Sequence, residues 1–179
     1  MNRTPRVETI FVAPEDSAPM EQLESVEAVE GGLTGDRYLT GKGYYSPFDV
    51  CEVTFIEGEA IETIREEFGI DLSDGRHRRN VVTRGVDLHD LLETTFRVGD
   101  VEFRGTRPRP PCAHVEKVAD EENVMRALKE RRGGICADVV TGGELHVGDE
   151  IEIVEDAPRD VGRSIADRLR RQSESGPSH

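Results

Sequence analysis

Short apolar stretches separated by glycine-containing turn pairs run through most of the chain, and this spacing limits the folds that it can adopt. The clearest turn pairs are Gly99-Asp100, Gly142-Gly143 and Gly148-Asp149. Such pairs suit the positive φ angles of tight turns, and many short strands at turn-punctuated spacing are typical of β-barrels and β-sandwiches. We therefore predict a mainly β fold, a barrel or a sandwich, and not a doubly wound parallel sheet.

The segments between the turns have the patterns of short strands and a few helices. Apolar patterning predicts strands at residues 6–12, 25–30, 50–56, 80–83, 96–98, 101–103, 135–140 and 150–154. We expect the second of these strands to pair with the first. Helical spacing of apolar residues predicts helices at 57–68 and 121–131, the former ended by Gly69, and a single helical turn at 87–92.

Length and composition indicate one domain in a reducing compartment. The chain has 179 residues, which suits a single core, and we place this domain at residues 1–155. Residues 156–179 are polar and nearly neutral, so a short helix and a frayed tail are expected there. Three widely spaced cysteines do not suit a disulfide framework, and neither a signal peptide nor a membrane span is recognisable. A cytoplasmic protein with no membrane partner is the prediction.

The charge balance is strongly acidic. Asp and Glu number 37 against 23 Lys and Arg, which gives a net charge of -14. Because phosphate backbones would be repelled, we expect no nucleic-acid partner. All basic residues except Lys42, Lys117 and Lys129 are arginine. An acidic, halophile-like surface adapted to high salt explains this composition, and so does an arginine-rich coding background in a merely acidic protein.

Two motifs carry arginines that could meet an anion. The glycine-rich segment 31–37 ends in Arg37, and glycines allow a backbone to approach a ligand closely. A flexible turn explains this segment equally well. Residues 76–84 contain four arginines, including Arg78, which could clamp a phosphate by paired hydrogen bonds. The alternative for this run is a solvated loop whose arginines pair with nearby acids such as Asp74.

A third motif, RGTRPRPPCAH at residues 104–114, contains Cys112. Prolines keep the chain extended, and neighbouring arginines lower the pKa of a thiol and favour the thiolate that attacks or binds metal. The alternative is a small buried hydrophobic residue, although the polar, proline-rich flanks weaken it. Cys51 lies on an apolar strand face and is expected in the core, while the surroundings of Cys136 leave its role open.

Taken together, these motifs resemble the MOSC domain, the module named after the C-terminal domain of molybdenum cofactor sulfurases. The matching stretches occur in the family's order over most of residues 31–154. They are GLTGDRY, VTFIEGEA, RRNVVTRGVDL, FRVGD, PRPPCAH and GGICADVVTGGELHVGDEI. The likeness is greatest to the small stand-alone bacterial and archaeal members, which carry a Pro-Cys pair after an arginine-rich strand. The chain departs from the longer eukaryotic relatives, most of whose N-terminal β-barrel domain it lacks.

The resemblance implies a closed, mostly antiparallel β-barrel with peripheral helices and a molybdenum cofactor as ligand. Cys112 would be the catalytic and metal-ligating residue, which either ligates molybdenum or carries a persulfide. The residues expected to bind the pterin phosphate and ring, or to act as anion partners, are Arg37, Arg78, Asn80, Arg107 and Arg109. If they share one ligand, Arg37 and Arg78 must converge in space although they are about forty residues apart.

Three functions follow as alternatives. The first is a molybdenum-dependent oxidoreductase that reduces N-hydroxylated or N-oxygenated small molecules with electrons from an external electron-transfer protein. The second is a sulfur carrier in which Cys112 receives a persulfide from a pyridoxal-phosphate-dependent cysteine desulfurase. The third is a non-enzymatic domain stabilised by zinc on Cys112, Cys136 and either His114 or His146, although the spacing is not that of a zinc ribbon.

Overall fold

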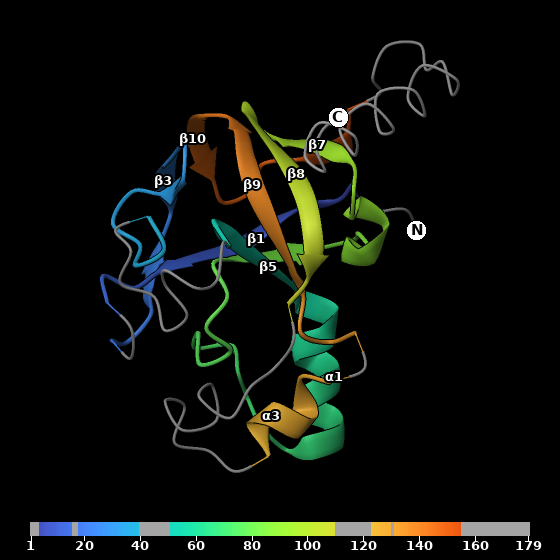
Figure 1. The fold of residues 1–179 in the computed structure, drawn as a ribbon. Coiled ribbons are helices and arrows are strands. Elements are labelled where there is room, and N and C mark those ends of the chain that lie inside the picture. The colour runs from blue at the N-terminus through green and yellow to red at the C-terminus, as the bar shows by residue number, and fades with distance from the viewer. Residues whose placement is uncertain (1–3, 16–17, 40–50, 110–122, 130, 155–179) are drawn as a thin grey trace, which may run out of the picture.

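The computed structural model describes residues 4–15, 18–39, 51–109, 123–129 and 131–154. Three helical segments lie in these ranges: α1 (Gly58–Phe68), the short 3-10 helix η1 (Leu88–Leu91) and α3 (Val124–Ala127). The strands, which dominate the view in Figure 1, are β1 (Arg6–Val12), β2 (Glu21–Leu23), β3 (Ser25–Val29), β4 (Gly32–Leu33), β5 (Val53–Glu57), β6 (Val81–Arg84), β7 (Thr95–Val98), β8 (Val101–Pro108), β9 (Ile135–Thr141), β10 (Gly143–His146) and β11 (Ile151–Ile153).

The strands form two sheets. The larger has the order β11-β7-β8-β9-β5-β6-β1-β2, and the smaller has the order β10-β3-β4. Neighbouring strands are antiparallel except β5 and β6, which are parallel. Helix α1 connects this parallel pair, because parallel neighbours need a crossover and cannot share a tight hairpin. The mainly β class with peripheral helices is thus confirmed, with a mixed sheet.

The two ends of the larger sheet approach each other without a continuous ladder. An isolated bridge joins Arg6 of β1 to Glu150, next to β11. Two backbone hydrogen bonds flank it, from Val7 N to Asp149 O at 2.9 Å and from Ile151 N to Pro5 O at 2.9 Å. This contact ties β1 to the β11 end of the sheet, and the expected closed barrel is not confirmed beyond it.

Locally determined elements agree with the sequence predictions. Helix α1 ends at Gly69, whose φ of 69° is left-handed, as its apolar stripe and the glycine indicated. Strands β7 and β8 form the predicted hairpin around Gly99, with φ 60°. The predicted pairing of residues 25–30 with the first strand is wrong: β3 pairs with β10 and β4, and β1 pairs with β2 and β6. The strands β2, β4 and β10 were not predicted, and it is their contacts with β1 and β3 that determine the observed pairing.

Two hydrophobic cores lie on opposite faces of the central strands. Phe55 faces the first core, where its ring packs edge-on to Phe96 at 5.5 Å and to Phe103 at 5.1 Å. The next residue, Ile56, faces the second core beneath α1. This is the expected alternation of side chains along a strand. Strand β5 is therefore held on both faces, which makes it a rigid frame for the residues beside it.

Some predictions fall outside the described ranges. These include Cys112, His114 and the C-terminal segment 156–179. The predicted helix at 121–131 appears, within residues 123–129, only as the four-residue α3. No helix in the described ranges is long and apolar enough to cross a membrane.

Candidate functional site

The arginine run at residues 76–84 divides into surface and interior residues. Arg76 forms an exposed ion pair with Asp74 at 2.9 Å, as a solvated loop predicts. Arg78 and Arg79, in contrast, are buried, and Arg79 is only 2% exposed. Charged side chains are rarely buried to this extent unless they are paired. The solvated-loop interpretation therefore holds for Arg76 and is wrong for Arg78 and Arg79.

The glycine-rich segment meets this run through a buried carboxylate. Asp36 Oδ1 accepts hydrogen bonds from Ala13 N at 3.1 Å, Arg37 Nη1 at 2.9 Å and Asn80 Nδ2 at 3.2 Å. Arg37 Nη2 donates to the carbonyl of Arg78 at 3.0 Å. The structure thus brings Arg37, Arg78 and Asn80 together across 41 residues of sequence, where scattered surface arginines would have remained apart.

Asn80 holds this arrangement in place. Its Oδ1 accepts from both the backbone N and the Oγ1 of Thr54, each at 3.0 Å. Its Nδ2 donates to Phe11 O at 3.1 Å and to Asp36. An amide has two donors and two acceptor lone pairs, so these four bonds use its full capacity. Asn80 therefore positions Asp36 and the strands around it.

Tyr38 and Arg109 form the next part of the site. Arg109 is buried and its Nη2 donates to Tyr38 Oη at 2.7 Å. The guanidinium of Arg37 lies 4.6 Å from the centre of the Tyr38 ring, and that of Arg109 lies 5.6 Å from it. Burial raises the pKa of the Tyr38 phenol, while the two arginines act against that shift. The phenol is therefore a neutral hydrogen-bonding group between two cations.

Arg79 is the residue that sequence reasoning did not single out. Its Nε donates to Gly133 O at 2.8 Å and its Nη1 to His77 O at 2.9 Å. Its Nη2 is buried and has no hydrogen-bond partner among the described residues. Burial, and next the charge of Arg109, lowers the pKa of Arg79 to about 10, so it is charged at neutral pH. The only sequence signal was its position directly before a buried strand.

His77 belongs to the same turn and is fully buried. Its Nδ1 accepts from Arg79 N at 2.8 Å, so the neutral ring carries its proton on Nε2. That Nε2 is buried without a partner in the described part of the chain. Burial lowers the pKa of His77 to about 3, and the charges of Arg79 and Arg78 act in the same direction. The turn therefore contains two buried donors with no acceptor among the described residues.

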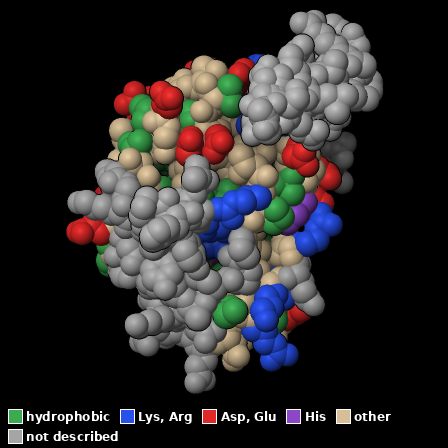
Figure 2. Space-filling model, in the orientation of Figure 1, with side chains coloured by type: hydrophobic (Ala, Val, Ile, Leu, Met, Phe, Trp, Pro, Cys, Tyr) green, Lys and Arg blue, Asp and Glu red, His purple; other side chains and the backbone are tan. Residues whose placement is uncertain are grey.

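We define the arginine cluster as Arg37, Arg78, Arg79 and Arg109. Asp36 is the only buried carboxylate among the described residues, against these four buried guanidinium groups. Buried charge is unfavourable unless it is compensated, so Arg79, whose buried Nη2 has no hydrogen-bond partner among the described residues, suits an anionic ligand. On the face shown in Figure 2, basic side chains gather near the middle, while acidic ones lie mostly toward the upper edge.

The buried His77 makes stability depend on pH. The unfolded chain binds a proton near pH 6.5, but the folded chain does so only near pH 3. Stability should therefore fall as pH drops from about 6.5 toward about 3, by up to ~1.4 kcal/mol per pH unit. His77→Gln keeps an acceptor for Arg79 N and does not titrate. Urea unfolding across this pH range should show the free energy of unfolding falling more steeply with decreasing pH in the wild type than in His77→Gln. If the two free energies change in parallel with pH, the lowered pKa of His77 is refuted.

The remaining candidates are placed as follows. Arg107 is half-buried and lies opposite Cys136 in the β8–β9 register. Cys51 is buried, as expected, and so is Cys136, whose Sγ lies 3.9 Å from Arg109 Nη1. Within the described ranges, the side chains spaced closely enough to hold a metal ion are Glu57, Asp87 and His89. This group includes neither Cys136 nor His146, which were considered as zinc ligands.

Comparison with known proteins agrees with this fold. The MOSC domain model matches residues 49–152, more than half of the chain, and the chain belongs to the MOSC domain family. Its structure is similar to that of the YUAD protein from Bacillus subtilis, with a TM-score of 0.70 and 19% identity over 84% of this chain and 96% of that one. No curated protein matches the chain.

Two further similar structures carry the same name in different bacteria. YiiM from Geobacillus stearothermophilus has a TM-score of 0.65 at 15% identity, over 86% of this chain and 77% of that one. YiiM from Escherichia coli has a TM-score of 0.60 at 18% identity, over 86% and 72%. At these identities the similarity shows the shared fold.

Proposed function

We propose that this MOSC protein binds a molybdenum cofactor whose phosphate contacts the arginine cluster. The observation that carries the proposal is the buried Nη2 of Arg79, a charged donor that has no hydrogen-bond partner among the described residues. A pterin phosphate is an anion with several acceptor oxygens, which suits the donors at Arg79 Nη2 and His77 Nε2. The residues present therefore fit the group that the family implies.

Each residue has a distinct part in this proposal. Arg37, Arg78, Arg79 and Arg109 supply positive charge, while Asn80 positions Asp36 beside them. Cys112 follows Arg109 by three residues and is the proposed thiolate ligand, since nearby cations favour the ionised thiol. When bound, molybdenum would supply oxygen-atom exchange. The free thiols of Cys51 and Cys136 are consistent with a cytoplasmic location.

The proposed reaction is reduction of an N-hydroxylated or N-oxygenated small molecule. The N–O bond breaks, the nitrogen is released as the amine, and the oxygen leaves as water after taking up protons and an electron pair. The sequence contains neither a nucleotide-binding loop nor a cysteine cluster for iron–sulfur. The electron pair therefore has to come from a separate electron-transfer protein.

The content of the purified protein tests this function against its alternatives. Protein from a molybdenum-replete source should contain molybdenum together with pterin phosphate. Labile sulfur on Cys112 without molybdenum would instead indicate a persulfide carrier that works with a cysteine desulfurase. Stoichiometric zinc that disappears in Cys112→Ser would indicate the zinc-stabilised domain.

The Cys112→Ser variant should lose the molybdenum while it keeps the wild-type fold. Cys51→Ser is the comparison variant: Cys51 is buried and its Sγ lies 3.9 Å from Val53 O, so placing a hydroxyl there should lower stability by ~1–3 kcal/mol, with a smaller loss of molybdenum than in Cys112→Ser. Metal analysis and urea unfolding measure the two effects. A Cys112→Ser protein with full molybdenum content would refute the role of Cys112.

A further inference from the structure

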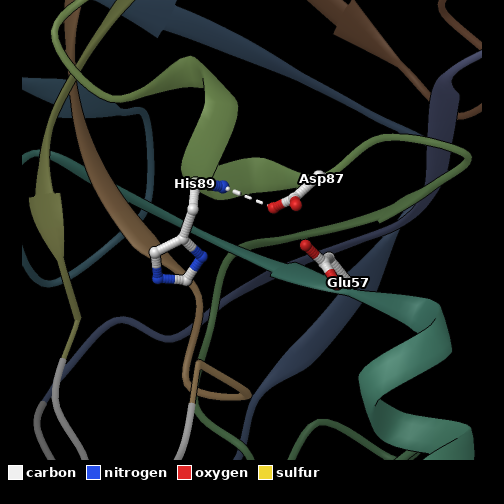
Figure 3. A group of neighbouring side chains, drawn as sticks. All are labelled: Glu57, Asp87 and His89. Carbon is white, nitrogen blue, oxygen red and sulfur yellow. Dashed lines mark hydrogen bonds between the residues drawn. The ribbon is translucent and has the colours of Figure 1, made fainter.

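A second group of chemically active side chains lies away from the arginine cluster, at the junction of β5 and α1. Figure 3 shows Glu57, at the end of β5, beside Asp87 and His89 of the η1 turn. One ligand atom of each residue lies within 4.8 Å of the others. We refer to these three residues as the carboxylate–imidazole cluster. Two segments about thirty residues apart therefore present an imidazole nitrogen and two carboxylates to one small space.

Buried atoms at this junction lack hydrogen-bond partners. Nδ1 of His89 is buried and has no partner among the described residues, and the same is true of Oε1 of the neighbouring Glu59. A buried imidazole nitrogen without a hydrogen-bond partner can be satisfied by a cation. This nitrogen is an observation separate from the spacing of the cluster.

The electrostatics of the junction also favour a cation. The ligand atoms of Glu57 and Asp87 lie within 4.8 Å of each other, so the negative charges of these two carboxylates repel each other. The basic group that contacts Asp87 is Arg131, at 3.5 Å in an exposed ion pair. Such pairs contribute little, so the repulsion among the carboxylates is poorly compensated. A divalent ion would remove this repulsion.

We propose that the carboxylate–imidazole cluster binds a divalent first-row transition metal ion of the zinc class. Imidazole nitrogen selects such ions over Mg²⁺ and Ca²⁺, which prefer oxygen ligands alone. Zinc binds nitrogen and oxygen ligands at roughly 2.0–2.2 Å, so the ligand atoms of a tetrahedral site lie about 3.3–3.6 Å apart. The ligand atoms here lie within 4.8 Å of one another, so rotation of the side chains would have to bring them closer on binding. The proposal does not depend on the cofactor proposal.

The expected role of this ion is to tie η1 to the start of α1. The existing tie is a hydrogen bond in which Glu57 Oε2 accepts from Leu88 N at 2.8 Å, while Asp87 Oδ1 accepts from His89 N at 3.0 Å within η1 itself. Three protein ligands leave a fourth position for water or for Glu59. The bound ion should therefore stabilise the folded protein.

Zinc titration of the chelator-treated protein tests the proposal. Calorimetry with Zn²⁺ should show one site, and His89→Gln should weaken it by at least ~10–100-fold, the range seen even for outer-shell changes. Asp87→Asn and Glu57→Gln keep acceptors for the bonds to His89 N and Leu88 N, so they should weaken binding without unfolding η1. His146→Gln is the matched control, since His146 also lies beside acids, Glu144 at 3.2 Å and Asp149 at 3.8 Å.

Repeating the titration with Cys112→Ser separates this site from zinc on the thiol. The proposal predicts that Cys112→Ser and His146→Gln bind Zn²⁺ like the wild type, and that Zn²⁺ raises the melting temperature while equal Mg²⁺ does not. It is overturned if the wild type binds no Zn²⁺, or if His89→Gln binds as tightly as His146→Gln.

Discussion

Replacing Gly134 with alanine is expected to lower the free energy of unfolding by at least ~4 kcal/mol, a large share of the ~5–15 kcal/mol that stabilises a typical domain. Gly134 has a φ of +85°, a left-handed conformation that residues with a Cβ adopt at a cost. An added Cβ would lie 1.8 Å from Phe55 O, far inside van der Waals contact. Because this neighbour is backbone of the buried strand β5, it cannot move aside as a surface side chain would.

The same substitution would disturb the arginine cluster. Gly134 O accepts from Arg109 N at 2.8 Å, and the adjacent Gly133 O accepts from Arg79 Nε at 2.8 Å. Moving this segment away from Phe55 would therefore shift both arginines. Gly148→Ala is the matched control, since Gly148 also has a positive φ, +96°, but no atom lies within 4 Å of its added Cβ.

Urea unfolding followed by circular dichroism measures both variants. Gly148→Ala should lose only ~1–2 kcal/mol, the cost of the left-handed backbone alone. If Gly134→Ala is no less stable than Gly148→Ala, the close packing of Gly134 on β5 is not as the structure has it.

Features that depend on neighbouring residues were predictable from the sequence. The apolar stripe of α1 and its terminal Gly69 are both local, and so is the hairpin at Gly99. Strand pairing was less accessible, because residues 25–30 could pair with any strand of suitable pattern. One of the two partners of β3 is β10, more than a hundred residues later. Nothing near β3 in the sequence specifies that choice.

The candidate site was predictable in part for the same reason. Arg37 and Arg78 could be named from their motifs and from the family resemblance, and the structure brings them together. Burial of Arg79 could not be predicted, because it depends on contacts with Gly133 and Arg109 from distant segments. A run of arginines is equally compatible with a solvated loop, and only the fold shows which members turn inward.

Replacing Arg79 with methionine is expected to lower cofactor retention at least ~10-fold, while the cofactor-free protein stays folded. Removing a buried charge relieves its desolvation penalty, which opposes the loss of the hydrogen bonds to Gly133 O and His77 O. We expect these effects to leave a net change of about 1–2 kcal/mol. The anion, in contrast, loses a charge-assisted donor in a buried setting, where each such bond is strong.

Two variants serve as controls for Arg79→Met. Arg79→Lys keeps the charge but not the planar fork of donors, so it should restore only part of the binding. Arg84→Met removes an arginine outside the cluster, one that pairs with Glu8 at 2.8 Å and with Glu62 at 2.9 Å. Arg84→Met should lower the free energy of unfolding without affecting cofactor binding.

The molybdenum-to-chain ratio of these proteins, purified from one molybdenum-replete source, tests the central claim most directly. If the arginine cluster binds the cofactor, the wild type and Arg84→Met should contain equal molybdenum, and Arg79→Lys an intermediate amount. In Arg79→Met the molybdenum content should fall at least ~10-fold, since losing a charge-assisted hydrogen bond weakens binding by more than ~1.4 kcal/mol. Equal molybdenum in Arg79→Met and Arg84→Met, or none in the wild type, would contradict it.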